Sequence, residues 1–232
     1  MSGGDQMFFY DNYVAIIGDI VDSKKIKDRK AIQQKLKNVL ADINAKYSED
    51  IASKFTIVLG DEFQGLLKNR NNIMKIICEI EMVMTPVQLR FGIGIGDIRT
   101  DINFDNSSEI DGPAYHRARK MIKEIESKKF QYTERHSNIM ICSGENNIEI
   151  DELLNSILSV CTALKSKWTD RQKEIIYAYL SNDENQYKAA HILDIGQPSV
   201  NKALSKARYY SYKSAIDTVN SFLSKERGKH NG

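Results

Sequence analysis

Two acidic pairs, each beside a short apolar run, are the residues of this sequence that are best suited to chemistry. Asp19 and Asp22 lie in the stretch GDIVDSK, and Asp61 and Glu62 lie in LGDEFQGLL. Clustered carboxylates repel one another unless a cation compensates them, and Mg²⁺ takes one or two carboxylates together with substrate phosphates. Two metal ions held in this way could activate a hydroxyl and stabilise a pyrophosphate leaving group.

The alternative interpretation of the same acids is purely structural. Gly-Asp is common in hairpin turns, so Asp61 and Glu62 could form a solvated turn between two strands. Asp19 could simply end a strand, and Asp22 could cap the helix that follows. The elements that position the four acids therefore have to be worked out next.

Apolar spacing predicts these elements. We expect a buried strand over 13–20, where the run is almost entirely apolar, and an amphipathic helix over 29–47, where apolar residues recur every three or four positions. Two antiparallel strands, FTIVLG and FQGLL, are joined at Asp61 and Glu62. A helix over 71–84 follows, and then a glycine-containing strand VQLRFGIGIGDI, a helix GPAYHRARKMIKEIE and a closing strand SNIMICSG.

The resulting order, βαββαβ followed by a loop and αβ, predicts an α+β fold. We expect a ferredoxin-like, palm-type domain with a mostly antiparallel sheet and helices on one face, and then an all-α helix-turn-helix domain. In this layout Asp19 and Asp61 share one edge of the sheet. The predicted boundaries are 10–146 for the palm domain, 147–168 for a connector helix and 169–232 for the helix-turn-helix domain.

Charge is distributed unevenly along the chain. Residues 165–232 carry 12 Lys and Arg against 7 Asp and Glu, a net charge of +5, whereas residues 1–164 carry 21 against 24, a net charge of −3. A basic C-terminal part favours nucleic acid as its partner.

Cysteine usage and hydropathy indicate the compartment. The three cysteines are widely spaced and form no C-x-x-C pair, which is typical of thiols in a reducing environment. No stretch approaches the ~20 apolar residues of a membrane span, and the start MSGGDQMFFY lacks a basic region followed by an apolar one. We expect a cytoplasmic protein without a membrane partner.

The basic C-terminal part has the features of a helix-turn-helix. Thr169 is expected to cap a helix, Gly196 permits the tight turn of QYKAAHILDIGQPSVNKALSKARYY, and Pro198 opens its second helix. The outward residues of that helix combine groups that read base edges with cations that contact phosphates. The predicted DNA-binding residues are Gln197, Ser199, Asn201, Lys202, Lys206 and Arg208. Binding of a protein instead of DNA is the alternative.

The ordered combination of motifs resembles a known group of proteins. AIIGDIVDSK followed by IVLGDEFQGLL is similar to the two metal-binding signatures of palm-type nucleotide cyclases, both the class III enzymes and the GGDEF diguanylate cyclases. LRFGIGIGDI resembles their fourth strand, and DGPAYHRARKM resembles the helix after it. The whole chain looks most like the SatD family, whose members join such a domain to a C-terminal helix-turn-helix.

The resemblance implies roles for individual residues. Asp19 and Asp61 would bind Mg²⁺ or Mn²⁺, the carbonyl of Ile20 would assist, and Glu62 lies at a position that also contacts metal in the diguanylate group. Ser23, Lys24 and Gly60 are the predicted contacts to a purine nucleotide.

Two positions on the helix that opens with G-P-A differ from the class III pattern. Where those enzymes stabilise the transition state with an Asn and an Arg, this chain has His116 and Lys120. These two are its candidate catalytic residues. Lys120 can neutralise phosphate charge, but it lacks the bidentate geometry of arginine.

Three functions are compatible with these observations. The first is a regulatory protein in which a nucleotide bound with metal controls the DNA-binding unit. The second is an active nucleotide cyclase or nucleotidyl transferase that makes a cyclic or oligomeric signal, and the third is a degenerate palm that serves as a dimerisation scaffold. We prefer the first, because the metal-binding aspartates are present and the Asn and Arg pair is not. A homodimer would suit both domains.

Overall fold

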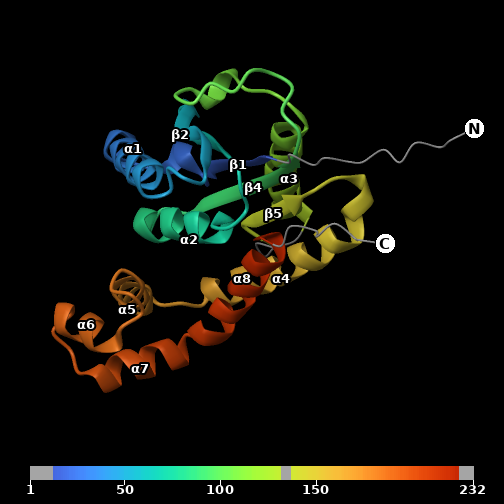
Figure 1. The fold of residues 1–232 in the computed structure, drawn as a ribbon. Helices are drawn as coiled ribbons and strands as arrows, with labels where there is room; N and C mark the ends of the chain where they lie inside the picture. Colours follow the sequence, from blue (N-terminus) through green and yellow to red (C-terminus); the bar gives the residue numbers. More distant parts are fainter. Residues whose placement is uncertain (1–12, 132–136, 225–232) are drawn as a thin grey trace, which may run out of the picture.

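The computed structural model describes residues 13–131 and 137–224, which form a five-stranded sheet surrounded by helices (Figure 1). The strands are β1 (Tyr13–Ile20), β2 (Ile51–Leu59), β3 (Glu62–Leu67), β4 (Leu89–Gly96) and β5 (Ile139–Cys142), in the spatial order β2-β3-β1-β4-β5. The fold is therefore α+β, as expected from the order of the predicted elements.

The sheet is mixed, which corrects the prediction of a mostly antiparallel sheet. β1 is antiparallel to both β3 and β4, and β2 is antiparallel to β3, but β5 is parallel to β4. The reason is the crossover through α3 (Pro113–Gln131), because a helical crossover returns the chain in its original direction.

Helices cover both faces of the sheet, so the prediction of helices on one face is wrong. On one face α1 (Arg29–Lys46) and α2 (Ile73–Met84) share a buried cluster with Val14 and Ile16 of β1. On the other face α3 packs against Ala15 and Ile17. Because alternate residues of a strand point to opposite faces, the almost entirely apolar β1 needs cover on both sides.

Glycines in β4 allow α3 to lie directly on the sheet. A Cβ atom at Gly92 would overlap the carbonyl oxygen of Ala118, and one at Gly94 would overlap the carbonyl oxygen of Ala114. The alternating glycines of β4 thus fix the distance between α3 and the strand.

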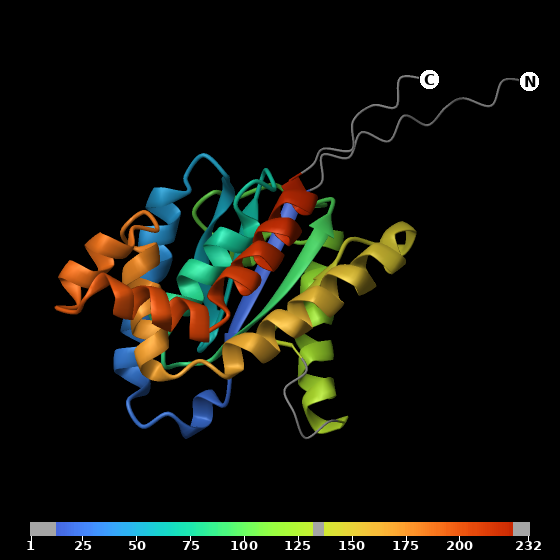
Figure 2. The same cartoon turned by 90° about the horizontal axis from the view of Figure 1, so that it is seen from below.

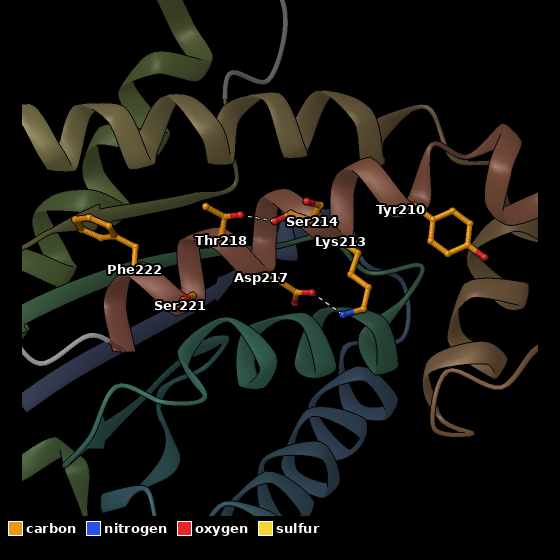
Figure 3. A pocket seen from close by; sticks show the side chains of 7 residues that line it. All are labelled: Tyr210, Lys213, Ser214, Asp217, Thr218, Ser221 and Phe222. Atoms are coloured by element: carbon orange, nitrogen blue, oxygen red, sulfur yellow. Dashed lines mark hydrogen bonds and ion pairs between the residues drawn. The ribbon is translucent and has the colours of Figure 1, made fainter.

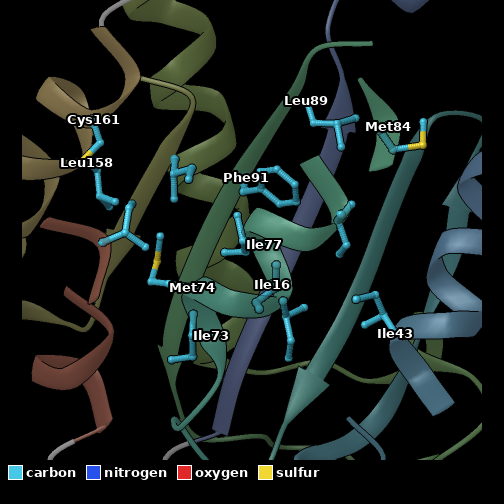
Figure 4. Packing of buried hydrophobic residues seen from close by; sticks show 14 of the residues in the cluster. Ile16, Ile43, Ile73, Met74, Ile77, Met84, Leu89, Phe91, Leu158 and Cys161 are labelled. Carbon is cyan, nitrogen blue, oxygen red and sulfur yellow. The ribbon is translucent and has the colours of Figure 1, made fainter. Parts of the chain in front are cut away.

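The C-terminal helices continue the core of the sheet. They are α4 (Ile148–Ser166), α5 (Asp170–Leu180), α6 (Gln186–Ile192), α7 (Gln197–Lys206) and α8 (Tyr209–Ser224). One buried cluster extends from Ile16 and Phe91 of the sheet through Met74 of α2 to Leu158 and Cys161 of α4 (Figure 4). α8 packs against α2, and the view from below shows the two helices side by side (Figure 2).

The division of the chain at residues 146 and 168 stays a prediction, because the buried cluster continues across both positions.

Short 3-10 helices lie at Ser23–Lys25, Ser107–Glu109 and Glu145–Asn147. Among the helices of the described residues, none has the length and apolar character needed to cross a bilayer.

Candidate functional site

The acidic edge lies where β1 ends beside the β2–β3 hairpin. Gly60 adopts a φ of 62°, and the Asp61 N–H donates to the carbonyl of Leu59 at 2.7 Å, so the turn consists of Gly60 and Asp61. Glu62 is already the first residue of β3 and pairs with Asp19 across the strands. Asp19, Asp61 and Glu62 therefore share one edge of the sheet.

On the α3 side of this edge, Asp19 is bound by an arginine. Arg90 of β4 donates to Asp19 Oδ2 through Nε at 2.9 Å and through Nη2 at 2.5 Å, and it also pairs with Glu126 of α3 at 2.7 Å. The side chains of Arg90 and Asp19 are only 14% and 15% exposed. Burial raises the pKa of Asp19 above its ordinary value; Arg90 counteracts this rise, and the charge of Asp61 adds to it.

A second arginine compensates Glu62 on the same side. Arg119 of α3 lies 3.3 Å from Glu62 Oε1 and 3.5 Å from Gln64 Oε1. Arginine side chains of this chain thus supply positive charge to both carboxylates on the α3 face.

On the α1 side of the edge, the hairpin tip closes a pocket of about 330 Å³. Gln33 of α1 holds the tip in place, because its Nε2 donates to the carbonyl of Gly60 at 3.0 Å. The pocket is lined by Ile20, Ser23, Ile26, Arg29, Lys30, Ile32, Gln33, Gly60 and Asp61. Four predicted site residues, Ile20, Ser23, Gly60 and Asp61, are thereby brought together.

The lining divides into an apolar wall and a polar rim. Three isoleucines form the wall, while Arg29 and Lys30, at the start of α1, are exposed and form no ion pair within the described residues. Cations beside a hydroxyl and a carboxylate suit the phosphates of a ligand, and the apolar wall suits a less polar group attached to them.

The fit of a metal ion can be judged from these side chains. Within residues 13–131 and 137–224, no group of three or more His, Cys, Asp or Glu side chains could hold a metal ion. Asp61 is the carboxylate that lines the pocket, while Asp19 is held by Arg90. The residues therefore fit Mg²⁺ held by Asp61 together with ligand phosphates better than a metal ion shared by Asp19 and Asp61.

Besides Asp19 and Glu62, which face α3, three further predicted residues lie outside the pocket lining. Lys24 is exposed on the turn before α1. His116 and Lys120 are exposed on α3, and His116 pairs with Asp111 at 2.8 Å. α3 begins beside Gly94, far along β4 from the acidic edge, and its contact with Arg90 at that edge comes from Glu126. The arrangement does not bring His116 to Asp61.

Asp22 also differs from expectation. It adopts a left-handed φ of 53° and makes no side-chain capping bond; its carboxylate lies 3.5 Å from Lys25. The residue that caps α1 is Asp28, whose Oδ1 accepts from the Ala31 N–H at 3.0 Å.

The C-terminal candidate surface lies on α7 and on Arg208, which follows this helix. As predicted, Gly196 precedes this helix and Pro198 occupies its first turn; Val200 and Leu204 are its buried residues. Gln197 is half-buried and donates to Gln186 of α6 at 2.5 Å. The other predicted DNA-binding residues, all exposed, are Ser199, Asn201, Lys202, Lys206 and Arg208.

Comparison with protein families decides the affiliation of the chain. The SatD family model matches residues 13–217. This chain belongs to the SatD family. A search of curated proteins finds no match.

Solved structures add a distant likeness to this SatD-family chain. The crystal structure of a regulator of polyketide synthase expression from Bifidobacterium adolescentis matches with 11% sequence identity and a TM-score of 0.27. The match covers 92% of this chain and 86% of that one. At this TM-score the likeness carries no argument.

A second hollow of the SatD-family chain lies along α8 (Figure 3). It measures about 550 Å³ and is lined by residues of α8 alone, including Lys213, which pairs with Asp217 at 2.6 Å, and Thr218, which bonds to Ser214. A surface formed by one helix surrounds no ligand, so we assign no site to it.

Sequence reasoning missed four functional candidates in this SatD-family chain: Arg29, Lys30, Arg90 and Arg119. A signal for Arg90 existed, because an arginine inside the otherwise apolar strand LRFGIGIG needs a buried partner. Arg29 and Lys30 could have been found as two cations at the start of the helix that follows GDIVDSK.

Proposed function

We propose that this SatD-family protein is a nucleotide-responsive regulator. Its palm-like part would bind a purine nucleotide with Mg²⁺ or Mn²⁺, and its helix-turn-helix would bind DNA. The observation that carries the proposal is the pocket beside α1, which combines Arg29 and Lys30 with Ser23 and Asp61. Cations, a hydroxyl and a metal-binding carboxylate are the groups that a nucleoside phosphate requires.

The palm assignment is supported by strand order. β1 lies between β3 and β4, and β2 flanks β3, as in a βαββαβ ferredoxin-like unit. β5 then extends the sheet beyond β4.

The DNA-binding assignment is supported by α7. Lys202, Lys206 and Arg208 are exposed and form no ion pair within the described residues, and Asn201 lies beside them. The sequence of α7, QPSVNKALSK, contains no acid that would repel phosphates. A convex cationic helix with amide side chains suits the major groove.

The test of the pocket is an incubation with each nucleoside triphosphate and Mg²⁺ or Mn²⁺, read by mass spectrometry and by calorimetric binding. We expect an intact purine nucleotide to bind, and Asp61→Ala to weaken this binding. Asp42→Ala, which removes an exposed acid of α1, is the control. A cyclic or oligomeric product that disappears in Asp61→Ala would favour the active cyclase instead, and failure of every purine nucleotide to bind would contradict the proposal.

The test of α7 is the salt dependence of DNA binding. Replacing Lys202, Lys206 and Arg208 by alanine should make the negative slope of log K against log salt shallower by about 2.7, since each phosphate contact contributes about 0.9 to its magnitude. The control replaces three exposed lysines elsewhere, Lys27, Lys37 and Lys75. Equal effects of the two triple variants would refute a specific role of α7.

We further propose that the protein acts as a homodimer, because helix-turn-helix proteins commonly read paired half-sites. Sedimentation should then give twice the chain mass of 26.5 kDa. A monomer at DNA-binding concentrations would count against this assembly.

A further inference from the structure

α8 is joined firmly to α7. Ala207 and Arg208 alone separate the two helices, and the Trp168 indole Nε1 donates to the Ala207 carbonyl at 2.7 Å. Tyr209, which begins α8, is buried and packs edge to face against Tyr179 of α5. A change in the direction of α8 would therefore move α7 with it.

The far end of α8 caps another helix. Asn220 Oδ1 accepts from the Met74 N–H at 3.0 Å, and Asn220 Nδ2 donates to the Asn71 carbonyl at 2.7 Å. Asn72, the N-cap residue of α2, makes no side-chain capping bond, and its amide donates instead to Asp50. Because the first N–H groups of a helix have no partner within it, Asn220 supplies what the local sequence does not.

The face of α8 opposite to this contact is exposed. Thr218 lies on that face, in the hollow of Figure 3, and among the described residues its hydroxyl bonds only to the Ser214 carbonyl of its own helix. It provides a matched control for Asn220.

α2 is held on its other side by α1. Lys46 and Tyr47 bond to Glu79 at 2.8 and 2.9 Å, and the Lys35 ammonium donates to the Thr85 carbonyl at 3.1 Å. α1 also carries Gln33, which binds the hairpin tip. Helix α2 thus lies between the helix that lines the pocket and the helix that carries α7.

We propose that α2 and α8 transmit occupancy of the pocket to α7, and that Asn220 is the positioning residue of this connection. The inference rests on the proposed nucleotide-binding function and adds its route of regulation. Coupling of this kind is reciprocal, so DNA on α7 would alter nucleotide affinity by the same factor.

Hydrogen exchange read by mass spectrometry tests the connection without any ligand. Asn220→Ala should speed exchange about fivefold in the first turn of α2, as expected for a lost helix cap, and also in residues 197–212. Asn220→Asp keeps the acceptor for Met74 and should give a smaller change. Thr218→Ala should leave both segments unchanged.

A merely local role for Asn220 would speed exchange at the start of α2 and the end of α8 but leave residues 197–212 as they are. That result would overturn the inference. If Asn220→Ala fails to fold, exchange in the Asn220→Asp variant distinguishes the same two outcomes.

A second arm uses ATP and GTP, each with Mg²⁺, on the unaltered protein. Protection at the pocket together with changed exchange in α7 supports the connection, and protection at the pocket alone overturns it. If neither nucleotide protects the pocket, the proposed nucleotide function fails, while the variants still decide whether Asn220 positions α7.

Discussion

The neighbouring carboxylates of the acidic edge lie in different environments on its two sides. On the α3 side, Asp19 and Glu62 are each held by an arginine from the same chain. On the α1 side, Asp61 faces a pocket whose cations, Arg29 and Lys30, form no ion pair within the described residues. On the α3 side the carboxylates are thus paired with arginines, whereas on the α1 side the cations can pair with a ligand.

The difference follows from strand geometry. Asp19 and Glu62 are cross-strand partners, so both side chains point to the face that α3 covers. Asp61 lies in the turn, where the alternation of a strand does not apply. Acids that are similar in sequence therefore belong to two environments, a scaffold and a candidate binding site.

The largest expected effect is that of Arg90→Ala. The substitution leaves Asp19 without its partner in a mostly buried position, and it also removes the partner of the more exposed Glu126, so we expect a loss of about 3 kcal/mol in the free energy of unfolding. Urea denaturation measures it. Arg119→Ala is the comparison, since that pair is more exposed, at 47% and 25%, and should contribute at most about 1 kcal/mol. An Arg90→Ala protein as stable as the parent would remove the distinction between the two sides.

A somewhat smaller effect is expected for Arg29→Ala combined with Lys30→Ala. Loss of two charge-assisted contacts should weaken nucleoside triphosphate binding about 30-fold, with little change in stability. Calorimetric titration measures the affinity, and Lys27→Ala combined with Lys37→Ala is the charge-matched control. Equal weakening by the control would show that general charge, rather than the pocket, attracts the ligand.

A small effect is expected for Gln33→Ala. Its side chain ties α1 to Gly60 through one exposed hydrogen bond, which is worth about 0.7 kcal/mol, or roughly threefold in ligand affinity. The same titration detects it, with Gln34→Ala on the neighbouring position as control. No change in affinity would mean that the hairpin tip keeps its position without α1.

The smallest expected effect is the change with pH in the contribution of Asp19 to the free energy of unfolding. Burial raises the pKa of Asp19, so the folded protein holds this proton more tightly than the unfolded chain. The contribution of Asp19 to the free energy of unfolding must then fall as pH rises from about 3.8 through the raised pKa. Asn at this position does not titrate, so the stability of the parent relative to Asp19→Asn should decline over that interval. A rise of this relative stability with pH would mean that folding lowers the pKa of Asp19 instead of raising it.

Local features were predictable from the sequence. β1 covers the predicted residues 13–20, α5 begins after Thr169, and Thr169 and Gln172 form a reciprocal capping box. Helix α1 ends one residue before the predicted boundary. Apolar periodicity and caps act over a few residues, and a single sequence contains both.

Features that depend on distant partners were not predictable. The parallel pairing of β5 depends on the path of α3, and the ion pair of Arg90 with Asp19 joins residues 71 positions apart. At the candidate site, the sequence contains Asp61, Ser23 and the two cations that begin a helix, but it does not show that this helix packs beside the hairpin and so brings Arg29 and Lys30 to Asp61.

The cap that Asn220 places on α2 has a consequence for synthesis of the chain. Asn220 is added 146 residues after Met74, which at 5–20 residues per second means roughly 7 to 30 s later. The sheet and its first helices can collapse on the ribosome during this interval, but α2 starts with unpaired N–H groups until α8 has emerged. The N-terminal cap of α2 therefore forms only after α8 has been synthesised. A nascent chain arrested before residue 220 would keep that end of α2 frayed.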